Sequence, residues 1–130
     1  MSSASLAVQR ALFAALHATP ALAGCALFDG VPVDAAPPYV TLGPDVVTDW
    51  SSKSAIGHEH RVQLTLWDQG PGSAGAKTLL AAVEATVRAL GGTTDGHRIA
   101  GVLFLRSFTT KAADGWTQGI AEFRIRTQQL

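Results

Sequence analysis

Hydrophobic residues recur every three or four positions in two segments of the chain, which is the spacing of amphipathic helices. The first segment runs from Ser5, a residue type that caps helix N-termini, to about Ala18, and Pro20 ends it. The second follows Ser73, another possible cap, and stops at the Gly91-Gly92 pair. We predict two helices, of which the second has the more regular apolar stripe.

Strict alternation of apolar and polar residues from His58 to Asp68 predicts a strand. One face would carry His60, Val62, Leu64 and Leu66, and the other Arg61, Gln63, Thr65 and Trp67. Further strands are predicted at residues 26–28, 39–43, 45–50, 98–109 and 116–127. The Asp114-Gly115 pair between the last two is typical of an antiparallel hairpin, and the polar residues 51–57 predict an exposed loop.

The order of these elements is helix, strands, helix and hairpin. It predicts an α+β fold, a single domain over residues 1–130 with a mostly antiparallel β-sheet and two amphipathic helices packed on one face. No apolar run reaches the roughly 18 to 20 residues that cross a bilayer, and the first ten residues lack an export pattern, so we expect no membrane and a cytoplasmic setting. Cys25 is the only cysteine, and we expect a buried, inert thiol.

Charge changes this picture because it is sparse and unevenly distributed. Charged residues make up 15% of the chain, below the usual value of about 25%, which favours a surface that is partly covered by other subunits. The stretch from Asp29 to Asp49 contains four acids and no base. From His97 onward, five bases face two acids, although the whole chain has no net charge. A uniformly basic nucleic-acid binder is therefore not indicated.

Two short motifs are candidate sites of chemistry. His58 and His60 project to the same side of a strand and could share a metal ion, but no spacing supplies a third ligand, so one packed and one partly exposed histidine is the favoured interpretation. The glycines before Lys77 resemble a phosphate-binding loop, yet Ala76 stands where that motif needs glycine. No serine lies in a nucleophile elbow. The sequence predicts no enzyme, no cofactor and no small-molecule substrate.

The chain resembles a known family in several segments taken together. These are the helix containing Leu12-Phe13-Ala14-Ala15-Leu16, the run Pro38-Tyr39-Val40-Thr41-Leu42-Gly43, the triplet Asp49-Trp50-Ser51, and the strand Glu59-His60-Arg61-Val62-Gln63-Leu64-Thr65-Leu66-Trp67. The resemblance is to the tail-terminator, or tail-completion, family of long-tailed phages, including the versions carried by gene-transfer agents. It covers nearly the whole chain, and its motifs are structural rather than catalytic.

The resemblance implies a structural virion protein, assembled in the bacterial host cytoplasm and located at the neck end of the tail. Such a protein forms a hexameric ring with copies of itself, caps the tail-tube protein, ends tail growth, and meets a head-completion or stopper protein. DNA would only pass through the channel. One alternative is another neck or tail protein, such as a stopper or tube subunit. A second is a small enzyme, either metal-dependent and using His58 and His60 or nucleotide-handling and using Lys77. A third is a host-derived binding module with a dimeric sheet.

Head-to-tail packing in a ring joins unlike surfaces, so we predict that the acidic region of one subunit meets the basic terminal hairpin of the next. Trp50 and Trp116 border predicted loops, where interface and core roles are equally expected, whereas Trp67 should be packed. The loop at 51–57 and the hairpin tip at 111–115 are the predicted docking points for the tube or neck protein. The interface candidates are Asp45, Asp49, Trp50, Lys53, Arg106, Lys111, Trp116, Arg124 and Arg126.

Overall fold

A computed structural model describes residues 3–130, so residues 1 and 2 of the predicted domain lie outside the described part. The elements in chain order are α1 (Ala4–His17), η1 (Pro20–Leu22), β1 (Ala26–Asp29), β2 (Tyr39–Asp49), β3 (Gly57–Gln69), α2 (Ala74–Arg88), β4 (Thr93–Thr94), β5 (His97–Lys111), η2 (Ala113–Gly115) and β6 (Trp116–Gln129). Among these residues, no helix is long and apolar enough to cross a membrane.

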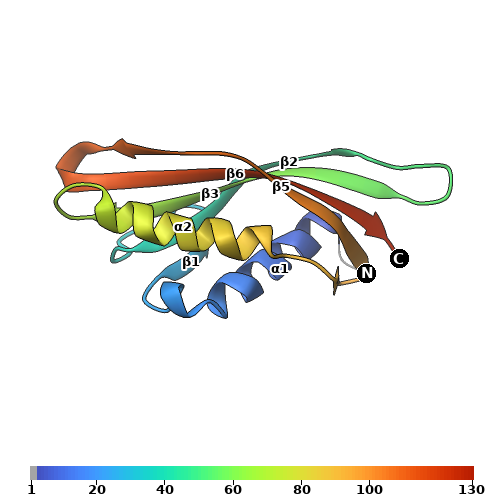
Figure 1. Cartoon of the computed structure of the whole chain (residues 1–130), viewed down its shortest axis with the longest axis horizontal. Coiled ribbons are helices and arrows are strands. Elements are labelled where there is room, and N and C mark those ends of the chain that lie inside the picture. The colour runs from blue at the N-terminus through green and yellow to red at the C-terminus, as the bar shows by residue number, and fades with distance from the viewer. Residues whose placement is uncertain (1–2) are drawn as a thin grey trace.

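The strands form one sheet in the order β1-β2-β3-β6-β5-β4. All neighbouring pairs are antiparallel except β1 and β2, which are parallel, so the predicted α+β fold with a mostly antiparallel sheet is confirmed. Strands β3, β5 and β6 have 13 to 15 residues, against a common length of about five or six. The β2–β3 and β5–β6 hairpins consequently reach opposite ends of the long axis of the molecule (Figure 1).

Both helices cover the same face of the sheet, as predicted (Figure 1). Alternate residues of β6 are buried beneath them, which is the pattern of a strand with one face in the core. Gly119 shows how closely α2 approaches, because a Cβ atom added there would lie 3.2 Å from Leu80. The largest fully buried side chains are Phe123, Leu12, Leu16, Leu64, Leu66, Ile125, His60 and Val8.

Some local predictions were wrong. Ser3, not Ser5, caps α1, because its hydroxyl accepts a hydrogen bond from the Leu6 backbone N–H at 3.1 Å. Residues 39–43 and 45–50 are not two extended runs but one strand, β2, with an irregularity in its pairing between Leu42 and Asp45. The Gly91–Gly96 loop also contains β4, a two-residue strand that pairs with the start of β5.

Candidate assembly surfaces

The sheet face that carries no helix is here called the open face. Strand register assigns residues to it, because the partners of core residues point toward the helices and the residues between them point away. Its members include Val46, Thr48, Glu59, Arg61, Gln63, Thr65, Trp67, Leu103, Arg106, Phe108, Thr110, Trp116, Gln118, Ile120, Glu122, Arg124 and Arg126. The open face therefore brings together Arg106, Trp116, Arg124 and Arg126, four of the predicted interface residues.

Three of these arginines already have carboxylate partners within the subunit. The Nε atom of Arg126 lies 3.0 Å from Glu59 Oε1, and that of Arg124 lies 3.8 Å from the same oxygen. Arg106 binds Glu122, and this hydrogen bond lowers the pKa of the Glu122 carboxyl and raises that of the Arg106 guanidinium. The predicted attraction of these arginines to an acidic neighbour is consequently weakened, because each would share its charge with an internal partner.

Trp116 packs into an aromatic cluster at one end of the open face. Its ring lies 6.0 Å from Tyr39 and 6.5 Å from Trp67, and Phe28 meets Tyr39 edge-on at 5.7 Å. Trp67 stacks on Tyr39 and donates its Nε1–H to Thr41 Oγ1 at 3.0 Å, which confirms the prediction that Trp67 is packed. Trp116 is half-buried in this cluster, so it contributes to the subunit's own stability.

Trp50 lies at the other end, beyond the last residue of β2. The guanidinium of Arg126 stands 5.0 Å from the centre of its ring, a cation–π distance. Together with Gly101, Leu103 and Arg124, these two side chains line a shallow groove of about 260 Å³. Trp50 is thus half-buried against its own subunit and partly available to another one.

The two acidic candidates on β2 lie on the helix side of the sheet. Asp45 accepts a hydrogen bond from Ser5 Oγ at 2.7 Å, and Asp49 accepts one from Ser51 Oγ at 2.6 Å. The bond from Ser51 lowers the pKa of the Asp49 carboxyl. Both aspartates are exposed, so both remain open to a second partner.

The two lysine candidates stand at opposite hairpin ends. Lys53 is exposed in the β2–β3 loop, in which Trp50 N–H and Gly57 O close the turn at 2.9 Å. Lys111 ends β5 and donates from Nζ to Gly72 O at 3.2 Å and to Thr117 Oγ1 at 3.0 Å. The structure therefore does not gather the nine candidates into one patch.

His58 and His60 lie close together on the helix side of β3. His60 has no exposed surface, and its Nε2 bonds Thr127 Oγ1 at 2.9 Å, while His58 is half-buried with its ring 6.2 Å away. Burial lowers the pKa of His60 to about 4, and nearby His58 adds to the effect. Within residues 3–130, no group of three or more His, Cys, Asp or Glu side chains could hold a metal ion. The predicted pair of one packed and one partly exposed histidine is confirmed.

Cys25, predicted to be a buried, inert thiol, is half-buried and packs against the edge of the core. Its partial burial still raises the pKa of the thiol, and the negative charge of Asp68 adds to the shift. Because the thiolate is the reactive form of cysteine, this shift lowers the thiol's reactivity.

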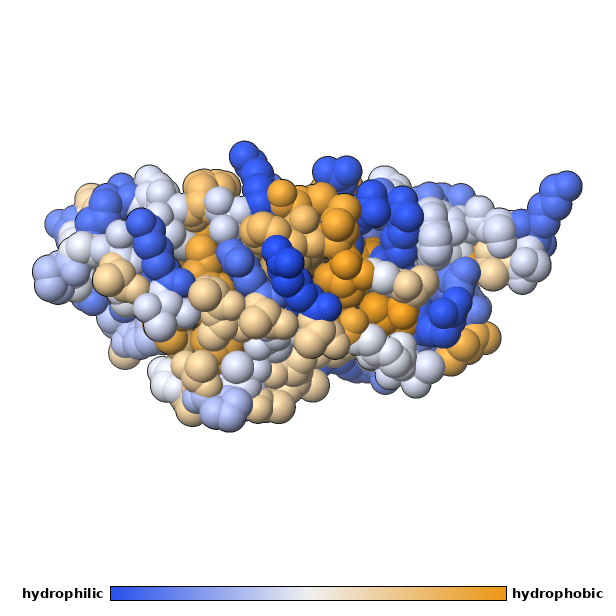
Figure 2. All heavy atoms as spheres, in the orientation of Figure 1, coloured by the Kyte–Doolittle hydropathy of each residue, from blue (hydrophilic) through white to orange (hydrophobic). Residues whose placement is uncertain are grey.

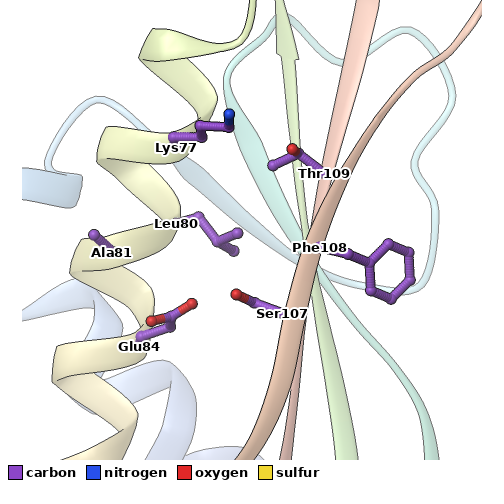
Figure 3. A pocket seen from close by; sticks show the side chains of 7 residues that line it. All are labelled: Lys77, Leu80, Ala81, Glu84, Ser107, Phe108 and Thr109. Carbon is purple, nitrogen blue, oxygen red and sulfur yellow. The ribbon is translucent and has the colours of Figure 1, made fainter.

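A groove between α2 and β5 was not predicted. It has a volume of about 290 Å³, and Figure 3 shows Ser107 and Thr109 pointing toward α2, with Phe108 on the opposite side of the strand. Lys77 and Glu84 line the helix side of this groove. Sequence patterns could not find it, because they do not show which strand lies at the sheet edge beside α2.

The single α+β domain offers three surfaces to other chains, which are the open face with its paired arginines and the two opposed hairpin ends. Comparison with known proteins gives the particular family. The family model described as "Tail completion protein gp17" matches residues 10–128, and the chain belongs to this family. It is therefore a structural protein of a phage-type tail, and its virion location follows from the same match.

Solved structures agree with this assignment. A chain of the "Virion of native gene transfer agent (GTA) particle" is 29% identical, with a TM-score of 0.83, and the match covers 98% of this chain and 99% of that one. A second solved chain shares the fold alone, at 16% identity and a TM-score of 0.50 over 94% of this chain and 96% of that one. Among curated proteins, no match was found.

Proposed function

We propose that this protein is a tail terminator, which forms a hexameric ring on the completed tail tube, stops its growth, and presents its other side to a head-completion protein. The observation that carries the proposal is the family match over residues 10–128. Its likeness to a chain of a gene transfer agent virion, along nearly the full length of both, supports assembly into a particle of that kind.

The shape of the subunit supports a role between two partners. The β2–β3 loop with Lys53 and the β5–β6 turn after Lys111 lie at opposite ends of the long axis (Figure 1). If this axis runs roughly along the tail, one hairpin end meets the tube and the other meets the neck. This arrangement retains the predicted docking role of both loops and leaves the sides of the subunit for contacts within the ring.

Tail length tests the proposal directly. Particles made without this protein should have tails of irregular length and few joined heads, as seen by electron microscopy, and supplying the protein should restore both. Native mass spectrometry of the restored neck complex should give six copies. Tails of normal length that join heads in the absence of the protein would contradict the proposal. If the protein itself is located inside the tube or beyond the neck, that would favour a tube subunit or a stopper.

A further inference from the structure

We infer that neighbouring copies join edge to edge, residues 45–49 of β2 in one subunit pairing antiparallel with residues 107–111 of β5 in the next. This inference rests on the proposed ring, for which it names the contact between subunits. The occupant of each edge is a second copy of this chain.

β2 and β5 each have a long stretch that the short strand beside it, β1 or β4, leaves without a neighbour in the described sheet. On β2, β1 covers the outer edge only as far as Leu42, so residues 43–49 have β3 on one side and no strand on the other. On β5, β4 reaches only Arg98, and the N–H of Ile99 binds Gly92 O, which leaves residues 100–111 open. Unpaired edges of this length are templates for pairing with another chain.

Irregularities shorten these edges to two stretches of matching length. On β2, Pro44 has no N–H to donate, and the regular part that follows it is 45–49. On β5, the pairing shifts between Phe104 and Arg106, which leaves the regular part 106–111 before the turn. A regular stretch of five residues on β2 is thus available to pair with a regular stretch of six residues on β5 of another subunit.

The two stretches carry complementary charge and exposed apolar surface. The β2 stretch has two acids and no base, whereas the β5 stretch has two bases and no acid, although one of these bases, Arg106, is already paired with Glu122 within the subunit. Val46 is 56% exposed and Phe108 is 40% exposed, both on the open face. Figure 2 also shows apolar atoms gathered at the surface over the middle of the molecule, near the end of α2 in Figure 1 and outside the two stretches.

Strand direction agrees with a head-to-tail ring. Three antiparallel steps separate β2 from β5 within the sheet, so these strands run in opposite directions. Rotation about a ring axis lying roughly along the strands keeps their direction, so β5 of one copy meets β2 of the next antiparallel. Six copies of four strands, about 4.8 Å apart, would close a cylinder roughly 37 Å across, wide enough to leave a channel.

Only one register fits these constraints. All five residues of 45–49 must face partners within 106–111, and side chains on the helix side must oppose others on that side. Asp45 lies on that side, as do Ser107, Thr109 and Lys111. Asp45 is then opposite Lys111, and Val47 is opposite Thr109.

The groove beside α2 gives the incoming side chains room. In the inferred register, Val47 and Asp49 of the neighbour point toward the helix layer, beside Thr109 and Ser107, which line this groove of about 290 Å³. Figure 3 shows both of these residues directed into the space next to α2. The helix side of the groove carries one charge of each sign, with Lys77 beside Thr109 and Glu84 beside Ser107.

Asp45 and Lys111 each have hydrogen-bonding capacity left for the other. An ammonium group has three donors, and two of those of Lys111 are used by Gly72 O and Thr117 Oγ1. A carboxylate accepts about four hydrogen bonds, and Asp45 receives one from Ser5 at its Oδ2 atom. The pair can therefore form between subunits without breaking a bond within either one.

Disulfide cross-linking in assembled particles tests the register. In a Cys25→Ser background, the cysteine pairs are Val46→Cys with Thr110→Cys and Val47→Cys with Thr109→Cys. Successive antiparallel pairs alternate between wide and narrow spacing, so one of the two should place its Cβ atoms close to the roughly 4 Å that a disulfide needs. The matched control is Val46→Cys with Leu103→Cys, which lies on the same face but seven residues out of register.

A ladder of covalent multimers on a non-reducing gel from one of the two pairs, and none from the control, is the expected result. If native mass spectrometry shows a ring but neither cysteine pair gives more cross-linking than the control, the edge pairing is overturned and the proposed ring still stands. Equal ladders from all three pairs would overturn the register. A particle of the Cys25→Ser protein with a single copy would contradict the ring itself.

A charge exchange gives a second measurement that does not need cysteines. Asp45→Lys and Lys111→Asp should each lower the fraction of protein in rings about tenfold, because each places like charges opposite one another. The double variant should recover to within about threefold of the original. A double variant that assembles no better than either single one would overturn the pairing, provided that thermal melts show all of them folded.

Discussion

Lowering the pH should destabilise this protein through His60, which is fully buried and bonded to Thr127. Burial, together with nearby His58 and His97, lowers its pKa to about 4, and Asp45 only partly opposes the shift. The unfolded chain, with a histidine pKa of about 6.5, therefore binds more protons than the folded one between these values. The stabilisation is present above about pH 6.5 and is lost as the pH falls toward 4, amounting to about 2 kcal/mol between pH 7 and pH 5.

Urea unfolding followed by tryptophan fluorescence at several pH values measures this loss. The His60→Gln variant keeps a side-chain nitrogen that can bond Thr127, but this group does not titrate. Between pH 7 and pH 5, the unfolding free energy of the variant should therefore fall by about 2 kcal/mol less than that of the original protein. The control is His17→Gln, because His17 is exposed and should leave the pH profile unchanged. Equal losses in the original protein and in His60→Gln would refute the assignment to His60.

Three further substitutions test the fold and the open face. Gly57→Ala should destabilise the protein by about 1–3 kcal/mol, since its Cβ would lie 2.4 Å from a backbone carbonyl oxygen. Gly101→Ala is the control, because a Cβ atom there meets open space, and it should change stability by less than about 0.5 kcal/mol. Thermal melting measures both changes. Phe123→Ala should cost about 3–5 kcal/mol in urea unfolding, because the ring has no exposed surface. Glu59→Gln removes the charge partner of Arg126, so binding of the isolated protein to heparin should strengthen and should weaken again with added salt.

Regular alternation and helical spacing were sufficient to predict most of the fold. β3 appears where polar and apolar residues alternate, with His60 and Val62 on the buried side as predicted. α2 begins directly after Ser73, although that side chain makes no capping hydrogen bond. These patterns are local, so a single chain shows them without knowledge of its neighbours.

The candidate site was harder to predict because it depends on strand order. The sequence marks Arg106 and Arg126 as basic, but only the register between β5, β6 and β3 places Glu122 and Glu59 beside them. In the same way, Phe108 looks like an ordinary core residue of an alternating strand. It is exposed because it lies on the open face of a strand that has no long neighbour on its outer side.

The free edges raise a question of specificity, since a subunit that pairs too readily would aggregate before the tail is complete. Pro44 and the pairing shift before Arg106 each interrupt an edge, and interruptions of this kind protect sheets from indiscriminate pairing. On the inferred contact, the same two features bound the only regular stretches and so select one register. Short stretches contribute little per pair, so a ring would gain stability mainly from closure and from the tube beneath it. We therefore expect the isolated protein to remain largely monomeric at micromolar concentration and to form rings when tail tubes are added. Sedimentation of the mixture would show this change. Stable rings without tubes would mean that contacts beyond these edges hold the subunits together.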